Sequence, residues 1–167
     1  FNEDEIYAEF SLDKNKPVIL FFGGGEFGLG EKRTVQILEA LINNLTTCQI
    51  ISISGRNKKM NNAFHMPVNK LDCNDRVKIL EYTNKVPELM SISNLVVTKP
   101  GGLTTSESLA SELPMLIINP IPGQEEENAE FLVAHNVGVW IKKSDDPNKV
   151  IQDLFKNKDK ILEMKKN

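Results

Sequence analysis

The sequence predicts an α/β fold, a doubly wound, Rossmann-like parallel sheet with helices on both faces. Short, continuous apolar runs such as 17–22 and 115–118 are typical of strands that are buried on both faces. Segments with a helical apolar stripe alternate with these runs along the chain. Glycine-containing loops follow several runs, as expected at the carboxyl edge of such a sheet, where ligands bind.

In the first half of the chain, apolar runs predict the strands and 3.6-residue periodicity predicts the main helix. No element is assigned to the polar stretch before residue 17, and the stretch 65–74 is ambiguous. In chain order we expect a strand at 17–22, a glycine cluster at 23–30, a helix with Val35, Leu38, Leu41, Ile42 and Leu45 on one side, a strand at 50–54, a short helix at 58–64 and a strand at 77–82.

In the second half, capping residues help to place the helices. Asp146 followed by Pro147 marks a helix start, since Asp caps a helix and Pro is tolerated in its first turn. In chain order we expect a helix at 86–93, a strand at 95–97, a helix after Gly101-Gly102, a strand at 115–118, a helix at 124–135, a strand at 139–141, a helix from 146 and a lysine-rich amphipathic segment at the end.

Length and composition limit the class of protein. At 167 residues and 40% hydrophobic, the chain can bury one substantial core, so we expect a single domain at 1–167. A net charge of −3 and scattered lysines give little support to a nucleic-acid role. No apolar run approaches the roughly 20 residues needed to span a bilayer, and no signal peptide opens the chain. Because the chain starts at Phe1, without an initiator Met, we expect a piece of something larger.

Six residues of types that often take part in catalysis or metal binding have simpler explanations. Cys48 and Cys73 lie within or beside apolar segments, so we expect reduced, packed thiols of a cytoplasmic protein. His65 and His135 have no acid and nucleophile at telling distances, so we expect surface or helix-end histidines. The pair Asp145-Asp146 adjoins a helix start, which favours capping, and we predict no metal.

The segment 98–110 predicts a phosphate site. Gly101 and Gly102 let the backbone approach a ligand, and the hydroxyl-rich helix that follows offers free N–H groups and the positive end of its dipole. Glu107, one turn inside that helix, can point back toward the same place and accept hydrogen bonds from a neutral diol such as a ribose. A phosphate beside a diol suggests a nucleotide.

The glycine cluster at 23–30 leaves more than one ligand open. Gly23, Gly25 and Gly28 satisfy G-x-G-x-x-G after a strand, which is the pattern of a dinucleotide site. A nicotinamide site would want an acid after the next strand, where this chain has Ser54-Gly55-Arg56. Arg56 could instead meet a 2′-phosphate, which keeps an NADP-linked oxidoreductase as an alternative. A turn that merely packs helix against strand is also open.

A third loop, 122–128, carries amide and carboxylate groups suited to neutral hydroxyls. Two glycine loops at one edge could close on a diphosphate from both sides, which suits a nucleotide-sugar. Glu126 and Glu127 are assigned to the first turn of a helix, where negative charge is favourable. For Gln124 and Glu125, the sequence supports two roles equally: a place in the first turn of the helix and contact with the ligand.

Four motifs together resemble one known family. They are Gly23-Gly24-Gly25-Glu26, Ser54-Gly55-Arg56-Asn57-Lys58-Lys59, Lys99-Pro100-Gly101-Gly102-Leu103-Thr104-Thr105-Ser106-Glu107, and Pro122-Gly123-Gln124-Glu125 with Asn128. The chain resembles the C-terminal, donor-binding half of family 28 glycosyltransferases, closest to the diacylglycerol sugar transferases that include monogalactosyldiacylglycerol synthase. The likeness covers essentially the whole chain.

The resemblance implies a two-domain GT-B enzyme whose other, N-terminal domain holds a lipid acceptor, diacylglycerol or glycosyldiacylglycerol, and the general base. It implies inversion in one displacement from a UDP-hexose, without a cofactor or an obligatory metal, in a cytoplasmic enzyme peripheral to the inner face of the membrane. The isolated domain is expected to bind donor without turnover. A stand-alone nucleotide-binding module remains an alternative. By motif, UDP would contact Gly25, Arg56, Tyr82, Thr83, Gly101, Gly102, Leu103, Thr104 and Glu107, and the hexose would contact Gln124 and Glu125.

Overall fold

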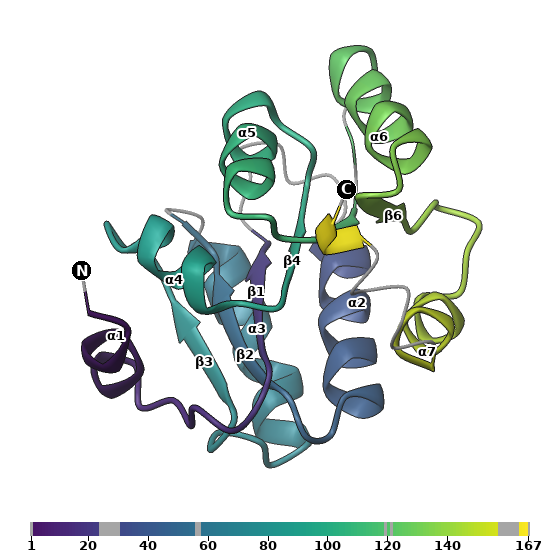
Figure 1. Cartoon of the computed structure of the whole chain (residues 1–167). Helices are drawn as coiled ribbons and strands as arrows, with labels where there is room; N and C mark the ends of the chain where they lie inside the picture. Colours follow the sequence, from purple (N-terminus) through teal and green to yellow (C-terminus); the bar gives the residue numbers. More distant parts are fainter. Residues whose placement is uncertain are drawn as a thin grey trace.

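The six strands form one parallel sheet in the order β3-β2-β1-β4-β5-β6, which is the doubly wound order (Figure 1). The structure is a computed structural model that describes residues 2–23, 31–55, 58–118, 120, 122–156 and 164–166. The predicted fold class is therefore confirmed. The strands are β1 (Val18–Phe22), β2 (Gln49–Ile53), β3 (Val77–Leu80), β4 (Leu95–Thr98), β5 (Met115–Ile117) and β6 (Gly138–Trp140).

Helices cover both faces of the sheet because both faces are apolar. Successive side chains of β1 enter different cores: Ile19 and Phe21 pack under α2, α3 and α7, whereas Leu20 packs under α1, α4 and α6. Figure 1 shows α7 beside α2 and α1 beside α4. The helices are α1 (Glu3–Glu9), α2 (Glu31–Asn44), α3 (Lys58–Lys70), α4 (Val86–Ile92), α5 (Gly102–Ala110), α6 (Gln124–Ala134) and α7 (Pro147–Lys156).

Two helices depart from the sequence expectation. α3 continues to Lys70, beyond the expected end at residue 64, although Pro67 cannot donate to the Ala63 carbonyl. Phe64 and Val68, one turn apart, are both fully buried against the sheet, and their packing outweighs the lost hydrogen bond. The second departure is α1, which the sequence analysis left unassigned.

α1 has a recognisable start signal. The Asn2 side chain accepts a hydrogen bond from the Asp4 N–H at 2.9 Å, and acidic residues fill the first turn. Ile6 is buried in the core on the α4 side. The capping residue and the acidic turn together could have predicted this helix.

The loop after β6 is tied to α2 by one arginine. Arg33 Nη2 donates to the Lys142 carbonyl at 2.9 Å and to the Asp145 carbonyl at 2.7 Å. Asp145 Oδ2 also accepts from the Lys142 N–H at 2.9 Å, and Asp146 Oδ1 accepts from the Asn148 N–H at 3.0 Å. The acid pair thus orders this loop and the start of α7, which confirms the predicted capping.

The two cysteines are free and buried, as expected of packed thiols. Burial raises the pKa of the Cys48 thiol and of the Cys73 thiol, and the nearby Arg76 guanidinium only partly offsets this effect. Both thiols therefore stay protonated at neutral pH.

Gly23 is required by packing. Its N–H donates to the Ile53 carbonyl at 3.0 Å, and a Cβ at this position would lie 2.1 Å from Phe64 Cζ. Phe64 cannot retreat easily, because its ring is fully buried and packs edge-on against Phe21 with centroids 5.7 Å apart.

Gly23→Ala should therefore lower the free energy of unfolding by about 1–3 kcal/mol through overpacking. Urea denaturation measures the change. Gly101→Ala is the matched control, because a Cβ there meets no heavy atom within 4 Å and φ is −70°. Equal stability of Gly23→Ala and the parent would show that Phe64 yields to the extra methyl group.

Candidate functional site

The described ligand residues predicted from the sequence lie in the loops that leave the carboxyl ends of the strands and in the helices that follow those loops. Because the strands are parallel, the loops after β3, β4 and β5 all emerge at one edge of the sheet. Tyr82 and Thr83 follow β3, Gly101 and α5 follow β4, and Gln124 begins α6 after β5. Gly25 and Arg56 belong to the loops after β1 and β2 and lie outside the described residues.

The start of α5 is suited to an anion. Gly101 is its N-cap, with φ −70° and ψ 155°, and no side chain in the part that the structure describes caps the helix. The N–H groups of the first turn, Gly102 to Thr104, have no carbonyl four residues back within the helix. Together with the helix dipole, these groups favour a negative charge directly in front of α5.

Asn128 ties the Pro100 turn to α6. Its Nδ2 donates to the Pro100 carbonyl at 2.8 Å, and its Oδ1 accepts from Gln124 Nε2 at 2.9 Å. This amide therefore brings Gln124 next to the turn that precedes α5. The sequence motif that contains Asn128 gives no sign of this contact, because Pro100 lies 28 residues away in the chain.

The turn before α6 depends on a glycine. Gly123, the N-cap of α6, has φ +103° and ψ −122°, a conformation that side chains disfavour. This turn sets where the exposed Gln124 and the half-buried Glu125 begin the helix. Both residues lie at the predicted edge, and their contribution to a ligand stays a prediction.

Glu107 lies one turn further along α5. Helical spacing places it three and four residues after Thr104 and Leu103, and helical side chains lean toward the N-terminus of their helix. The half-buried carboxylate can therefore reach toward the same edge as the first turn. Thr105, in the preceding turn, carries a buried Oγ1 that has no hydrogen-bond partner among the described residues.

The loop after β3 offers backbone groups and two side-chain hydroxyls. Thr83 Oγ1 accepts from the Lys85 N–H at 3.0 Å, so this hydroxyl is already engaged within the loop. Tyr82 is 71% exposed beside it. The Thr83 hydroxyl keeps its own proton to donate, so both this hydroxyl and the Thr83 backbone are available to a ligand.

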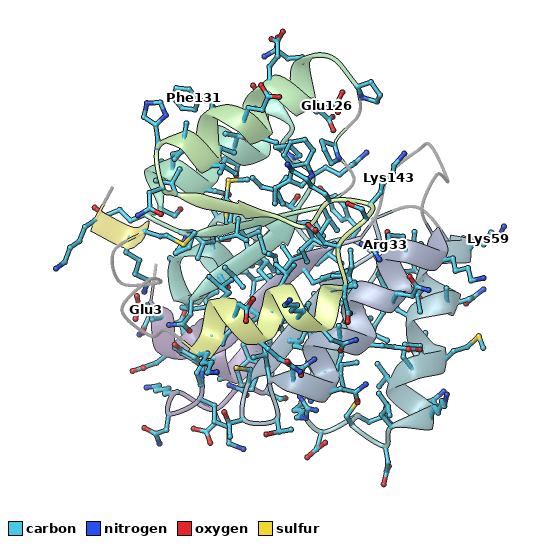
Figure 2. The ribbon with its side chains drawn as sticks, turned by 90° about the vertical axis from the view of Figure 1, so that its right-hand side faces the viewer. Glu3, Arg33, Lys59, Glu126, Phe131 and Lys143 are labelled. Atoms are coloured by element: carbon cyan, nitrogen blue, oxygen red, sulfur yellow. The ribbon has the colours of Figure 1, made fainter. Side chains whose placement is uncertain are left out.

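Other residues with possible chemistry lie away from this edge. His65 and His135 are exposed, and His135 Nδ1 lies 2.8 Å from the Phe131 carbonyl at the end of α6. The His135 ring also packs on the exposed ring of Phe131, which Figure 2 labels on α6. The surface and helix-end prediction is confirmed.

The described residues contain neither a metal-binding cluster nor a membrane-spanning helix. No three His, Cys, Asp or Glu side chains of the described residues group in a way that could hold a metal ion. None of the helices in the part that the structure describes is both long and apolar enough to cross a membrane.

Comparison with known proteins identifies the family. Residues 18–167 match the glycosyltransferase family 28 C-terminal domain. The chain belongs to this family. The resemblance inferred from the four motifs is therefore confirmed.

The curated relatives are longer than this chain. A processive diacylglycerol beta-glucosyltransferase of Staphylococcus epidermidis is 35% identical over 170 residues, covering 98% of this chain and 40% of the relative. The Bacillus subtilis protein of the same name is 28% identical over 162 residues, covering 97% and 41%. The chain thus spans about two fifths of the length of these relatives.

Solved structures share the fold. The glycosyltransferase WaaG, involved in lipopolysaccharide biosynthesis, matches with a TM-score of 0.70 and 20% identity over 99% of this chain and 45% of WaaG. Anabaena Alr3699/HepE in complex with UDP-glucose matches with a TM-score of 0.72 and 18% identity over 99% of this chain and 46% of that protein. These neighbours place the chain in the architecture of half a GT-B glycosyltransferase.

Asn128→Ala should loosen the turn in front of α5. The loss of one hydrogen bond to the Pro100 carbonyl should lower the local opening free energy by about 0.5–1.5 kcal/mol. Amide hydrogen exchange at Gly101 and Thr105, whose N–H groups bond within this turn, measures the effect.

Gln124→Ala is the control, because it removes only the exposed Gln124–Asn128 bond and leaves the bond from Asn128 to Pro100. The control should leave the exchange rate at Gly101 unchanged. If Asn128→Ala also leaves this rate unchanged, Asn128 does not hold the turn.

Proposed function

We propose that this chain is the donor-binding domain of an inverting glycosyltransferase that moves a hexose from a UDP-sugar to a lipid acceptor, diacylglycerol or glycosyldiacylglycerol. The observation that carries the proposal is the uncapped start of α5 beside α6, held together by the bond from Asn128 to the Pro100 carbonyl. Membership of family 28 and the names of the curated relatives support the same activity.

The diphosphate of the donor is assigned to the start of α5. Backbone N–H groups of Gly102, Leu103 and Thr104 would bond its oxygens, and Gly101 and Gly25, from the loops after β4 and β1, would complete the surroundings of the diphosphate. A structural neighbour in complex with UDP-glucose supports a nucleotide-sugar as the ligand of this fold. Helix N-termini and backbone N–H groups suit phosphate because they provide positive potential without a mobile side chain.

The nucleoside is assigned to three segments of the same edge. The carboxylate of Glu107 would accept hydrogen bonds from the ribose hydroxyls. The backbone of Thr83 would meet the uracil, with the exposed Tyr82 beside it and Arg56 near the nucleotide. The hexose is assigned to Gln124 and Glu125, whose amide and carboxylate groups suit neutral hydroxyls.

Bond making and breaking follow from this placement. The oxygen of the acceptor hydroxyl attacks the anomeric carbon, the bond from that carbon to the β-phosphate oxygen breaks, and its electrons remain on the departing UDP. The hydroxyl proton passes to a general base, which we assign to the part of the enzyme that precedes this domain. The N–H groups at the start of α5 stabilise the charge that develops on UDP, so no metal or cofactor is invoked.

We assign the binding site for the lipid acceptor to the part of the enzyme that corresponds to the remaining three fifths of the relatives' length. Holding acceptor and donor together supplies about 7–11 kcal/mol of a barrier, so this domain alone should bind the UDP-hexose without turnover. The complete enzyme would work at the inner face of the membrane, where it meets its lipid.

Glu107→Ala should weaken UDP binding by about ten- to 150-fold, because it removes a charge-assisted acceptor worth about 1.5–3 kcal/mol. Calorimetric titration with UDP measures the affinity. Glu112→Ala, which removes the exposed acid just beyond the end of α5, is the matched control. Equal UDP affinity in Glu107→Ala and the parent would remove Glu107 from the ribose site.

Substitution of both Gln124 and Glu125 by Ala should change the preference between UDP-glucose and UDP-galactose more than it changes UDP affinity. A site that bonds particular hydroxyls rejects an epimer that leaves its polar groups unpaired. Transfer assays with the complete enzyme give the ratio of kcat/KM for the two donors. An unaltered ratio would show that Gln124 and Glu125 serve only to start α6 and do not contact the hexose.

A further inference from the structure

A buried amide lies at the carboxyl end of β2. Asn61, in the second turn of α3, is 9% exposed, and its Nδ2 donates to Ser54 Oγ at 3.0 Å. Ser54 is fully buried. Burying an amide is costly unless it is hydrogen-bonded, so the partner of Asn61 decides what this residue contributes.

Ser54 in turn holds the end of β3. Its N–H donates to the Leu80 carbonyl at 2.9 Å, and its Oγ lies 3.3 Å from the same oxygen and 3.4 Å from the Gly55 carbonyl oxygen. A hydroxyl can accept from an amide while it donates to a carbonyl. Asn61, Ser54 and Leu80 therefore form a chain of hydrogen bonds that joins α3, β2 and β3.

This chain of bonds acts on a weakly held strand. β3 has four residues and, among the strands that the structure describes, it pairs with β2 alone. Leu80 is its last residue, and Thr83 follows three positions later. The other buried side chains of α3 are apolar. Among the buried side chains of this helix, that of Asn61 can therefore form hydrogen bonds and fix the position of a polar group.

We propose that Asn61 is a positioning residue for nucleobase selectivity, which acts through Ser54 on the segment 81–83. The inference rests on the proposed function, in which the Thr83 backbone meets the uracil. Uracil presents a carbonyl and an N–H where cytosine presents an amino group and an acceptor nitrogen. A backbone segment discriminates between them only if its own N–H and carbonyl groups are held in place.

The test compares UDP with CDP by calorimetric titration of this chain. Asn61→Ala and Ser54→Ala should each lower the preference for UDP over CDP by about two- to tenfold, the range expected for one hydrogen bond. The double variant should lower it no further than either single variant, because both changes break the same chain of bonds. Binding of inorganic diphosphate should stay within twofold of the parent in all three.

Asn44→Ala is the matched control. Asn44 Nδ2 donates to the Ala40 carbonyl and to Asn148 Oδ1 at the far end of α2, so its loss affects packing but not the segment 81–83. Thermal unfolding of every variant separates a loss of stability from a loss of selectivity. If Asn61→Ala does not fold, Ser54→Ala decides alone, since it removes a single hydroxyl.

An unchanged ratio of UDP to CDP affinity in the folded variants would overturn the inference, as would additive losses in the double variant. A parent chain that binds diphosphate but shows no UDP preference would instead overturn the proposed function, and the inference with it.

Discussion

All six strands run in the same direction, and the position of every proposed ligand group depends on this constraint. Parallel strands need crossover helices, and both faces of the sheet are then covered by packed side chains. Ligands are left with the carboxyl edge, where loops and helix N-termini meet. The start of α5 and the loop after β3 come to this edge for the same topological reason.

Side-chain amides complete what the backbone topology begins. The sheet brings the loops to one edge, but long-range hydrogen bonds fix them relative to one another. Asn128 joins α6 to the Pro100 turn, and Asn61 joins α3 to the end of β2 through Ser54. In both cases the partner is a buried or half-buried oxygen, where a missing donor is costly. The edge is therefore organised before any ligand arrives.

The sequence predicted the layout well wherever one local pattern decides the structure. The run 17–22 is apolar on both faces and forms β1, and the turn Gly101-Gly102 starts α5 as expected. Prediction failed where tertiary packing overrides a local signal: Pro67 suggests a break, yet the burial of Phe64 and Val68 continues α3. α1 was missed although its capping residue is visible in the sequence.

Site residues divide in the same way. Backbone donors such as those of Gly102 could be expected from a glycine turn before a helix. The roles of Asn61 and Asn128 could not, because each depends on a partner that only the folded chain brings near. Gly23 is another residue whose role depends on a distant partner. The glycine pattern that contains it suggests a phosphate loop, but the structure shows a packing reason for this glycine, because Phe64 leaves no room for a side chain.

The most direct test of the central claim is a calorimetric comparison of UDP, UDP-glucose and NADPH as ligands of this chain. The uncapped start of α5, with Glu107 one turn behind it, predicts saturable one-site binding of UDP and UDP-glucose and no comparable binding of NADPH. Binding of NADPH as tight as that of UDP, or no saturable binding of UDP at all, would contradict the account.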